Sequence, residues 1–361
     1  MKKILFYINT IGFGGAERVI VNLANEFSMR ENKVILVTSF YDKEEYTLDN
    51  KVKRMSLEYK NLNESFIKKN IIRTLKLRKI CKKERPDIII SFMAEANFRA
   101  ILATRFLGIK TLISVRNDPN KEYPNILFKL VAKLLYPLVS GCVFQTEDAQ
   151  KWFSKRIQKK SKIILNHVDK KFYKIDFKGK RTNIVTVGRL EPQKNHKLLI
   201  RAFFRIINEF PKENLLIYGD GSLRKELEEL TITLGIEDRV IFKGSSMDIQ
   251  EKIKDAKLFV LSSDYEGLPN VVMEAMTLGI PVISTDCPCG GPKMLIDDNE
   301  NGILVKANDT QQMANAMRRV LSEPNFANYL AYNAKIKAKE FESNKVFEKW
   351  ENYIEQIINY K

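Results

Sequence analysis

Short apolar runs alternate with amphipathic helical patterns along most of the chain, and this alternation constrains the fold more than any other feature. In the first half, strands are predicted over residues 3–9, 33–39, 88–92, 111–115 and 141–145. In the second half they are predicted over residues 183–187, 214–218, 240–242, 258–261 and 281–284. Strands separated by helices form parallel sheets covered on both faces. The sequence therefore predicts an α/β protein with two Rossmann-like, doubly wound parallel sheets.

The alternation is interrupted once, by a polar and basic stretch over residues 166–181. At about 150 residues per domain, 361 residues are enough for two domains of ordinary size. We expect an N-terminal domain over 1–168, a C-terminal domain over 169–341, and a final helix over 342–361 that packs back on the first domain. Ligands of such sheets bind beyond the carboxyl ends of the strands, so a cleft between the two domains is the expected site.

Several kinds of segment and site are not supported by the sequence. No stretch approaches the ~20 apolar residues of a membrane-spanning helix. The N-terminal apolar run leads into a glycine-rich turn, so we interpret it as the first strand rather than a signal peptide. Four cysteines without CxxC spacing and two histidines support neither disulfides nor a His/Cys metal site. We therefore expect a cytoplasmic protein that needs no metal ion and no cofactor.

The positive charge is concentrated in the first half of the chain. Residues 1–175 contain 35 lysines and arginines against 17 acidic residues, whereas the remainder contains 26 against 27. A field of this kind attracts polyanions, and the candidates are nucleic acid, anionic membrane lipid and a phosphate-bearing substrate.

The first strand is followed by the turn Gly12-Phe13-Gly14-Gly15, which opens a helical pattern. A dinucleotide fingerprint would need a third glycine, where the chain has Glu17, and an acidic residue after the next strand, which ends in Ser39. We therefore do not predict a dinucleotide site. Gly14 and Gly15 still allow a ligand close to a helix N-terminus, with a tight turn and nothing more as the alternative.

Two cations follow the first strand of the second domain. Arg189 and Lys194 lie in the segment VGRLEPQKN, at the carboxyl end of that strand. A guanidinium fork and a mobile ammonium suit a diphosphate whose charge grows as it departs. The alternative is that both are solvated loop charges.

The segment EGLPNVVME, over residues 266–274, carries the strongest chemical signal. Pro269 is expected in the first turn of a helix, which leaves the N–H groups of Asn270 and Val271 facing an anion. Glu266 precedes this helix and Glu274 lies more than a turn inside it, so the two carboxylates can accept hydroxyls from different parts of one ligand. The apolar neighbours of Glu274 argue against an ordinary solvated glutamate.

The spacing E-x7-E, together with VGRLEPQKN, YGDGSLRKEL and GGAER, resembles the retaining glycosyltransferases of the family 4 type, which have the GT-B architecture. The resemblance covers the chain from Met1 to the C-terminal helix. It implies catalytic roles for Glu266, Arg189 and Lys194, with the two cations on the donor diphosphate and Glu274 on the ribose. The residues implied in donor binding are Gly14, Gly15, Arg189, Lys194, Gly244, Ser245, Glu266, Leu268, Asn270, Val271 and Glu274. In such enzymes the leaving phosphate is thought to take the acceptor proton on the same face of the sugar.

The acceptor side departs from the family pattern. Where many relatives have a histidine, this chain has Arg116 and Asn117. A helical stripe of cations that includes Lys69, Arg73 and Lys76 fits a polyanion. An apolar helix over 125–139, with Lys129 and Lys133 one turn apart, fits either a membrane interface or a buried core helix. Because no nucleic-acid-binding module is present, these features favour a lipid-linked acceptor at an anionic membrane surface.

The resemblance and the charge distribution together imply an enzyme that moves a hexose or N-acetylhexosamine from a nucleotide-sugar, with UDP favoured, and retains the anomeric configuration. The expected acceptor is a polyprenyl-diphosphate-linked cell-surface glycan such as capsule or O-antigen. No D-x-D pair is present, which agrees with metal independence. The enzyme is expected at the inner face of the plasma membrane. A sugar-nucleotide epimerase and a non-catalytic binder of membranes or nucleic acid are the alternatives. An epimerase would convert UDP-sugar without an acceptor, and a binder would tolerate loss of both glutamates.

Overall fold

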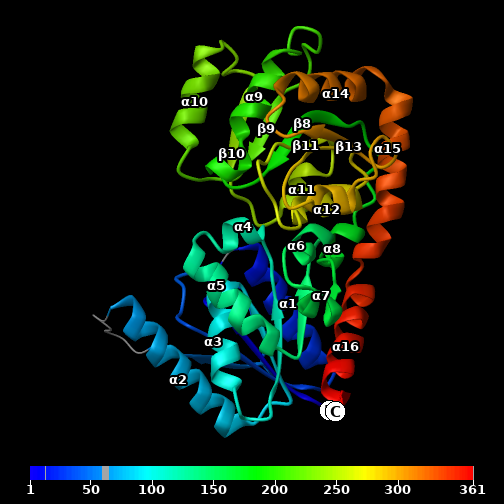
Figure 1. Ribbon diagram of the computed structural model, residues 1–361. Helices are drawn as coiled ribbons and strands as arrows, with labels where there is room; N and C mark the ends of the chain where they lie inside the picture. Colours follow the sequence, from blue (N-terminus) through cyan, green and yellow to red (C-terminus); the bar gives the residue numbers. More distant parts are fainter. Residues whose placement is uncertain (13, 59–64, 361) are drawn as a thin grey trace. The chain divides into compact units, whose positions relative to one another are not determined.

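The computed structural model describes residues 1–12, 14–58 and 65–360. Two residues of predicted elements lie outside these ranges: Phe13 of the glycine-rich turn and Lys361 of the final helix. The chain forms two compact units, Met1–Asn166 together with Val346–Lys361, and His167–Lys345. Each unit contains one parallel sheet, of seven and six strands (Figure 1).

The sheet of the first unit has the strand order β3-β2-β1-β4-β5-β6-β7. Its strands are β1 (Lys3–Ile8), β2 (Lys33–Thr38), β3 (Lys53–Ser56), β4 (Ile88–Phe92), β5 (Lys110–Ser114), β6 (Gly141–Phe144) and β7 (Ser161–Ile163). Its helices are α1 (Gly15–Met29), α2 (Phe66–Glu84), α3 (Ala94–Thr104), α4 (Pro119–Glu122), α5 (Ile126–Leu135), α6 (Glu147–Lys151) and α7 (Lys155–Lys159), with a 3-10 turn at Tyr136–Leu138.

Both faces of this sheet are covered by helices, as its strands of continuous apolar residues require. Ile4 and Phe6 of β1 face one core, which α1 completes, while Leu5 and Tyr7 face a second core that includes residues of α2 and α3. The last helix, α16 (Ser343–Asn359), contributes to the first of these cores. Its Trp350 is buried and stacks on Phe92 at 6.0 Å between ring centroids.

The sheet of the second unit has the order β10-β9-β8-β11-β12-β13. Its strands are β8 (Thr182–Val187), β9 (Leu215–Tyr218), β10 (Val240–Gly244), β11 (Ala256–Leu261), β12 (Val282–Asp286) and β13 (Ile303–Lys306). Its helices are α8 (Lys170–Tyr173), α9 (His196–Phe204), α10 (Arg224–Thr233), α11 (Ile249–Ile253), α12 (Asn270–Thr277), α13 (Gly291–Leu295), α14 (Thr310–Ser322) and α15 (Pro324–Lys337), with 3-10 turns at Pro192–Lys194 and Ala338–Phe341.

The prediction of an α/β protein with two Rossmann-like parallel sheets is confirmed. Three strands were not predicted: β3, β7 and β13. Each lies at the edge of its sheet, where a strand is short or half exposed and lacks a long apolar run. Within the part of the chain that the structure describes, no helix is long and apolar enough to cross a membrane.

Candidate active site

The second sheet reverses its strand order between β8 and β11, and the predicted donor residues follow these two strands. Such a switch point leaves a crevice at the carboxyl ends of the strands, because the connections on either side run in opposite directions. Arg189 and Lys194 follow β8, whereas Glu266 follows β11. The structure therefore brings Arg189 and Glu266 to the same end of one sheet, although they are 77 positions apart in the sequence.

The carboxylate of Glu266 is the centre of this arrangement. Its Oε1 lies 2.5 Å from Lys194 Nζ and accepts a hydrogen bond of 2.6 Å from Ser263 Oγ. Glu266 is only 6% exposed, so a charge here needs such partners. Ser263 was not predicted from the sequence, because nothing in its loop position shows that its hydroxyl turns toward Glu266.

The backbone around Glu266 is held by the loop that follows β12. Glu266 N–H donates to the carbonyl of Pro288 at 2.7 Å, and Cys289 N–H donates to the Glu266 carbonyl at 3.0 Å. A side chain at Gly291 would place its Cβ 1.6 Å from the Gly267 carbonyl oxygen. Glycine is therefore required at 291 for the two loops to lie this close.

The turn that carries Lys194 is tied to the same segment. Asp264 N–H donates to the Gln193 carbonyl at 2.9 Å, and Gln193 Nε2 donates to the Tyr265 carbonyl at 3.0 Å. Ser262 Oγ donates to the carbonyl of Lys194 itself at 2.9 Å. These bonds fix the base of the lysine side chain relative to Glu266.

Helix α12 begins at Asn270, and Pro269 precedes its first turn as the N-cap residue. The proline backbone is extended, with a ψ of 100°, and its carbonyl accepts from Val272 N–H at 3.1 Å. The N–H groups of Asn270 and Val271 precede that first helical hydrogen bond, as the prediction required. Glu274 is buried, at 3% exposure, and Leu268 is buried in the preceding loop.

Arg189 is exposed, in contrast to the other charged residues of the site. Its carbonyl oxygen lies 3.3 Å from Nε2 of the buried His196. Burial lowers the pKa of His196 to about 4, so the imidazole is neutral near pH 7. His196 was not predicted to contribute to the site.

Gly244 and Ser245 lie at the end of β10, two strands away from β8. Gly244 has a φ of 70°, and its carbonyl accepts from Gly219 N–H at 2.8 Å. Both residues are at the carboxyl end of the sheet, the same end as Glu266.

Gly14 and Gly15 belong to the first unit. Gly14 is the N-cap residue of α1 and Gly15 is its first residue. The Gly14 carbonyl accepts from Arg18 N–H at 3.0 Å. The predicted helix N-terminus is therefore present, although Gly14 itself is extended, with a φ of −146°.

Arg116 is buried in the first unit rather than presented at a surface. Its guanidinium donates to Asn166 Oδ1 and lies over the Phe92 ring, 4.6 Å from the centroid. Burial lowers the pKa of Arg116 to about 9. The adjacent Asn117 is half-buried and accepts from Asp118 N–H at 2.9 Å.

A second buried charge near Arg116 was missed from the sequence. Both carboxylate oxygens of Glu122 are buried, and burial raises its pKa to about 7. The backbone N–H groups of Arg116, Asn117 and Ala94 oppose this shift, as does the Arg116 charge. No spacing in the sequence indicated that the last residue of a four-residue helix would be turned inward.

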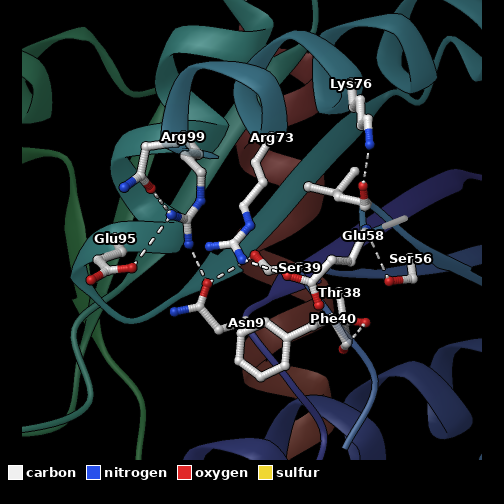
Figure 2. Close-up of polar contacts among 12 residues, drawn as sticks. Asn9, Thr38, Ser39, Phe40, Ser56, Glu58, Arg73, Lys76, Glu95 and Arg99 are labelled. Atoms are coloured by element: carbon white, nitrogen blue, oxygen red, sulfur yellow. Dashed lines mark hydrogen bonds and ion pairs between the residues drawn. The ribbon is translucent and has the colours of Figure 1, made fainter. Parts of the chain in front are cut away.

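Part of the predicted cation stripe of α2 has partners within the first unit. Arg73 donates to Glu58 at 2.8 Å, and Lys76 donates to the Leu57 carbonyl at 2.9 Å, so both turn toward the segment after β3 (Figure 2). Lys69 is half-buried. Lys79 and Lys83, on the same stripe, are exposed. Only part of the stripe therefore packs against the unit, and its binding of a polyanion stays a prediction.

Figure 2 also shows a buried arginine that the sequence did not single out. Arg99 of α3 is 3% exposed, and its guanidinium donates to Tyr7 Oη at 2.8 Å and to the side chains of Asn9 and Asn70. Asn9 follows β1 and also accepts from Ser39 Oγ at 3.0 Å. Arg99 thus fixes the polar residues at the carboxyl ends of β1 and β2.

The apolar segment 125–139 does not form one continuous helix. Only residues 126–135 form an α-helix, α5, and a 3-10 turn follows. Of the ten residues of α5, Ala132 alone is buried. The buried core helix is therefore excluded, and the membrane interface stays a prediction. No group of three His, Cys, Asp or Glu side chains that could hold a metal ion occurs among the described residues.

Comparison with known proteins identifies the family. The family model "Glycosyl transferases group 1" matches residues 167–337, and the model "Glycosyltransferase Family 4" matches residues 13–172. A Campylobacter jejuni protein described as GalNAc-alpha-(1->4)-GalNAc-alpha-(1->3)-diNAcBac-PP-undecaprenol alpha-1,4-N-acetyl-D-galactosaminyltransferase is 32% identical over 368 residues, which cover 99% of this chain and 100% of that protein.

A second Campylobacter jejuni protein, N-acetylgalactosamine-N,N'-diacetylbacillosaminyl-diphospho-undecaprenol 4-alpha-N-acetylgalactosaminyltransferase, is 29% identical and covers 96% of this chain and 97% of its own length. Among solved structures, Anabaena HepE in complex with UDP superposes with a TM-score of 0.82 at 19% identity, covering 98% of this chain and 100% of that one. The galactosyltransferase WaaB superposes with a TM-score of 0.79 at 23% identity over 99% of each chain. Because the two family models together match residues 13–337 and the first relative is 32% identical over almost the whole chain, this protein belongs to the family 4 glycosyltransferases and is a retaining enzyme with the GT-B fold.

Proposed function

We propose that this enzyme transfers a hexose or N-acetylhexosamine from a UDP-sugar to a polyprenyl-diphosphate-linked cell-surface glycan. Two relatives that match almost the whole chain are named for transfer of N-acetylgalactosamine to undecaprenyl-diphosphate-linked glycans. The structural relative HepE binds UDP and UDP-glucose. These names support the substrate classes, and the geometry of the second unit supports the donor site.

The observation that carries the donor assignment is the pairing of Glu266 with Lys194 and Ser263 at the switch point of the second sheet. A carboxylate there can accept hydroxyls of the transferred sugar, while the cation beside it faces the diphosphate. Arg189 and the N–H groups of Asn270 and Val271 would complete the diphosphate site. Glu274 would accept the ribose hydroxyls, with Leu268, Gly244 and Ser245 lining the nucleotide.

The proposed catalysis is electrostatic. As the bond between the sugar and the diphosphate breaks, negative charge grows on the leaving phosphate, and Lys194 and Arg189 stabilise it. The leaving phosphate then takes the acceptor proton on the same face, which retains the anomeric configuration. In this scheme Glu266 positions the sugar, and its partners Lys194 and Ser263 hold its carboxylate in place.

The first unit is proposed to bind the acceptor. Gly14 and Gly15 would approach the reacting sugar, while Arg116, Asn117, Lys69, Arg73 and Lys76 remain candidates for the acceptor glycan or its diphosphate. To contact the acceptor, Arg116 would have to release Asn166, and Arg73 would have to release Glu58. We place the enzyme at the cytoplasmic face of the plasma membrane, where a lipid-linked acceptor would be met.

Thermal unfolding with nucleotides tests the donor assignment. UDP at 100 times its Kd should stabilise the wild-type protein by about 2.7 kcal/mol, and GDP should stabilise it less. Glu274→Gln should lose most of the UDP effect, whereas Glu237→Gln, at an exposed position, should keep it. Equal stabilisation of Glu274→Gln and wild type by UDP would refute the assigned ribose contact.

A further inference from the structure

The outer face of α2 is apolar. Ile67, Ile71 and Leu75 follow one another at intervals of four residues and are 72%, 54% and 61% exposed. Side chains at this spacing lie on one face of a helix. Leu77 and Cys81 of the same helix are buried in the core, as expected of a helix that packs on a sheet. The exposed row is therefore a second apolar face, which the core does not need.

Helices α3 and α5 continue the same surface. Leu102 of α3 is exposed, and α5 exposes four more aliphatic side chains, Ile126, Leu127, Leu130 and Leu134. The three helices lie side by side in the first unit, with α3 between α2 and α5 (Figure 1). Among the residues that the structure describes, this α2–α3–α5 face contains eight of the eleven exposed isoleucines and leucines.

A groove of about 380 Å³ connects the three helices. Its walls include Ile71 and Leu75 of α2, Phe98 and Leu102 of α3, and Leu127 of α5. The apolar side chains therefore form one continuous patch rather than isolated exposures. Contiguous patches of this kind on a folded protein mark an interaction surface.

The charges around the patch indicate what it contacts. Helix α2 contains eight lysines and arginines and one acidic residue, and four of these cations, Lys68, Lys79, Lys82 and Lys83, are exposed. Helix α5 exposes Lys129 and Lys133 and contains no acidic residue. The first unit as a whole contains 34 lysines and arginines against 19 acidic residues. The partner must therefore offer apolar surface together with negative charge.

An anionic bilayer offers both, because acyl chains receive the apolar side chains and headgroup phosphates face the lysines. A second copy of this chain fits poorly, since a two-fold contact would place the cations of α2 and α5 against themselves. We propose that the α2–α3–α5 face inserts into the headgroup and upper acyl layer of an anionic lipid leaflet. The proposal rests on the proposed function only in that a lipid-linked acceptor gives such binding a purpose.

Vesicle binding of a labelled protein tests insertion directly. All four native cysteines are buried, so a single introduced cysteine can be labelled selectively with an environment-sensitive fluorophore. On phosphatidylcholine vesicles with about a quarter phosphatidylglycerol, a label at Leu130→Cys should shift to the blue. A label at Ile232→Cys, an exposed site in the second unit, should not shift.

The matched variants test which residues carry the binding. Leu127→Ser/Leu130→Ser should weaken binding to these vesicles by about tenfold or more, because two leucines no longer enter hydrocarbon. Ile232→Ser/Ile336→Ser, which removes exposed aliphatic residues elsewhere, should bind as the wild type does. Unchanged vesicle binding of Leu127→Ser/Leu130→Ser, or an unshifted label at Leu130, would overturn the proposal. The proposal would also fail if this double variant changed from a dimer to a monomer and still bound vesicles as the wild type does.

The test is independent of catalysis. UDP binding and sugar transfer to a short-chain, water-soluble acceptor need no membrane, so both should stay within about twofold of wild type in Leu127→Ser/Leu130→Ser. If transfer fails in the wild type while vesicle binding holds, the proposed function is wrong and the docking face stands. If vesicle binding fails while transfer holds, the docking face is wrong and the proposed function stands.

Discussion

At the scale of single residues, Ser263 is the least expected part of the site. It is fully buried and donates to the same oxygen of Glu266 that Lys194 contacts. A hydrogen bond to a charged carboxylate contributes about 1.5–3 kcal/mol. We predict that Ser263→Ala lowers kcat about 10- to 100-fold while UDP affinity changes less than about threefold.

Steady-state kinetics and calorimetric titration with UDP check this prediction. Ser322→Ala, at an exposed serine of α14, is the control and should behave as the wild type. A parallel loss of UDP affinity in Ser263→Ala would show that the serine supports the fold of the whole donor loop instead of positioning Glu266.

His196 gives the second prediction at this scale. Its pKa of about 4 lies below the ordinary value of 6.5, so the unfolded chain binds a proton that the folded protein does not. The stability from this residue is therefore complete above pH 6.5 and falls as the pH drops toward 4. Between pH 7 and pH 5 the loss should be about 2 kcal/mol.

Urea unfolding of wild type and His196→Gln at both pH values isolates this contribution. The wild type should lose about 2 kcal/mol more of its free energy of unfolding than the variant over this interval. Identical pH dependence in the two proteins would mean that His196 is not held neutral by burial.

At the scale of elements, the site depends on the close contact between the loops after β11 and β12. A Cβ at Gly291 would meet the Gly267 carbonyl at 1.6 Å, so Gly291→Ala must displace the backbone next to Glu266. We expect a loss of about 1–3 kcal/mol in stability and UDP binding weakened by at least about tenfold.

Gly235→Ala provides the matched control, because its φ of 65° also disfavours alanine but nothing lies within 4 Å of the added Cβ. It should cost about 1–2 kcal/mol and leave UDP binding unchanged. Thermal unfolding and UDP titration distinguish the two variants. Equal UDP affinity for both would contradict the role assigned to the loop contact.

The central strands could be predicted from the sequence because they are buried on both faces. Runs such as 88–92 contain only apolar residues and serine, and the structure has β4 over the same residues. Edge strands give no such signal, which is why β3 and β7 were missed. Helix α2 is harder to predict, since Leu77 and Cys81 pack in the core while Ile71 and Leu75 are exposed, and periodicity alone does not separate these two apolar rows.

Most residues proposed for donor binding were singled out because they lie in a loop after a strand or at a helix start, whereas Glu274 lies inside α12 and was singled out by its apolar neighbours. Their partners are less visible: Ser263 and His196 contribute through burial and geometry that no spacing encodes. Glu122 and Arg99 were missed for the same reason, as each is buried by contacts between segments distant in sequence.

At the scale of the whole molecule, the chain returns from the second unit to complete the first. Trp350 of α16 is 1% exposed and packs on Phe92 of β4. Trp350→Ala should destabilise the first unit by about 3–5 kcal/mol and leave the second largely unaffected. Calorimetry should then show an earlier transition for the first unit that UDP does not shift, with Tyr360→Ala, at an exposed site, as the control. A single, uniformly lowered transition would contradict this.

The central claim is that Glu266, held by Lys194 and Ser263, acts in retaining sugar transfer. Its most direct test is the rate of transfer from a UDP-sugar to a polyprenyl-diphosphate-linked acceptor, measured for wild type, Glu266→Gln and the exposed control Glu237→Gln. We predict a fall in kcat of at least about 100-fold for Glu266→Gln, with UDP affinity within about fivefold, and wild-type kinetics for the control. A wild-type kcat in Glu266→Gln would contradict the account.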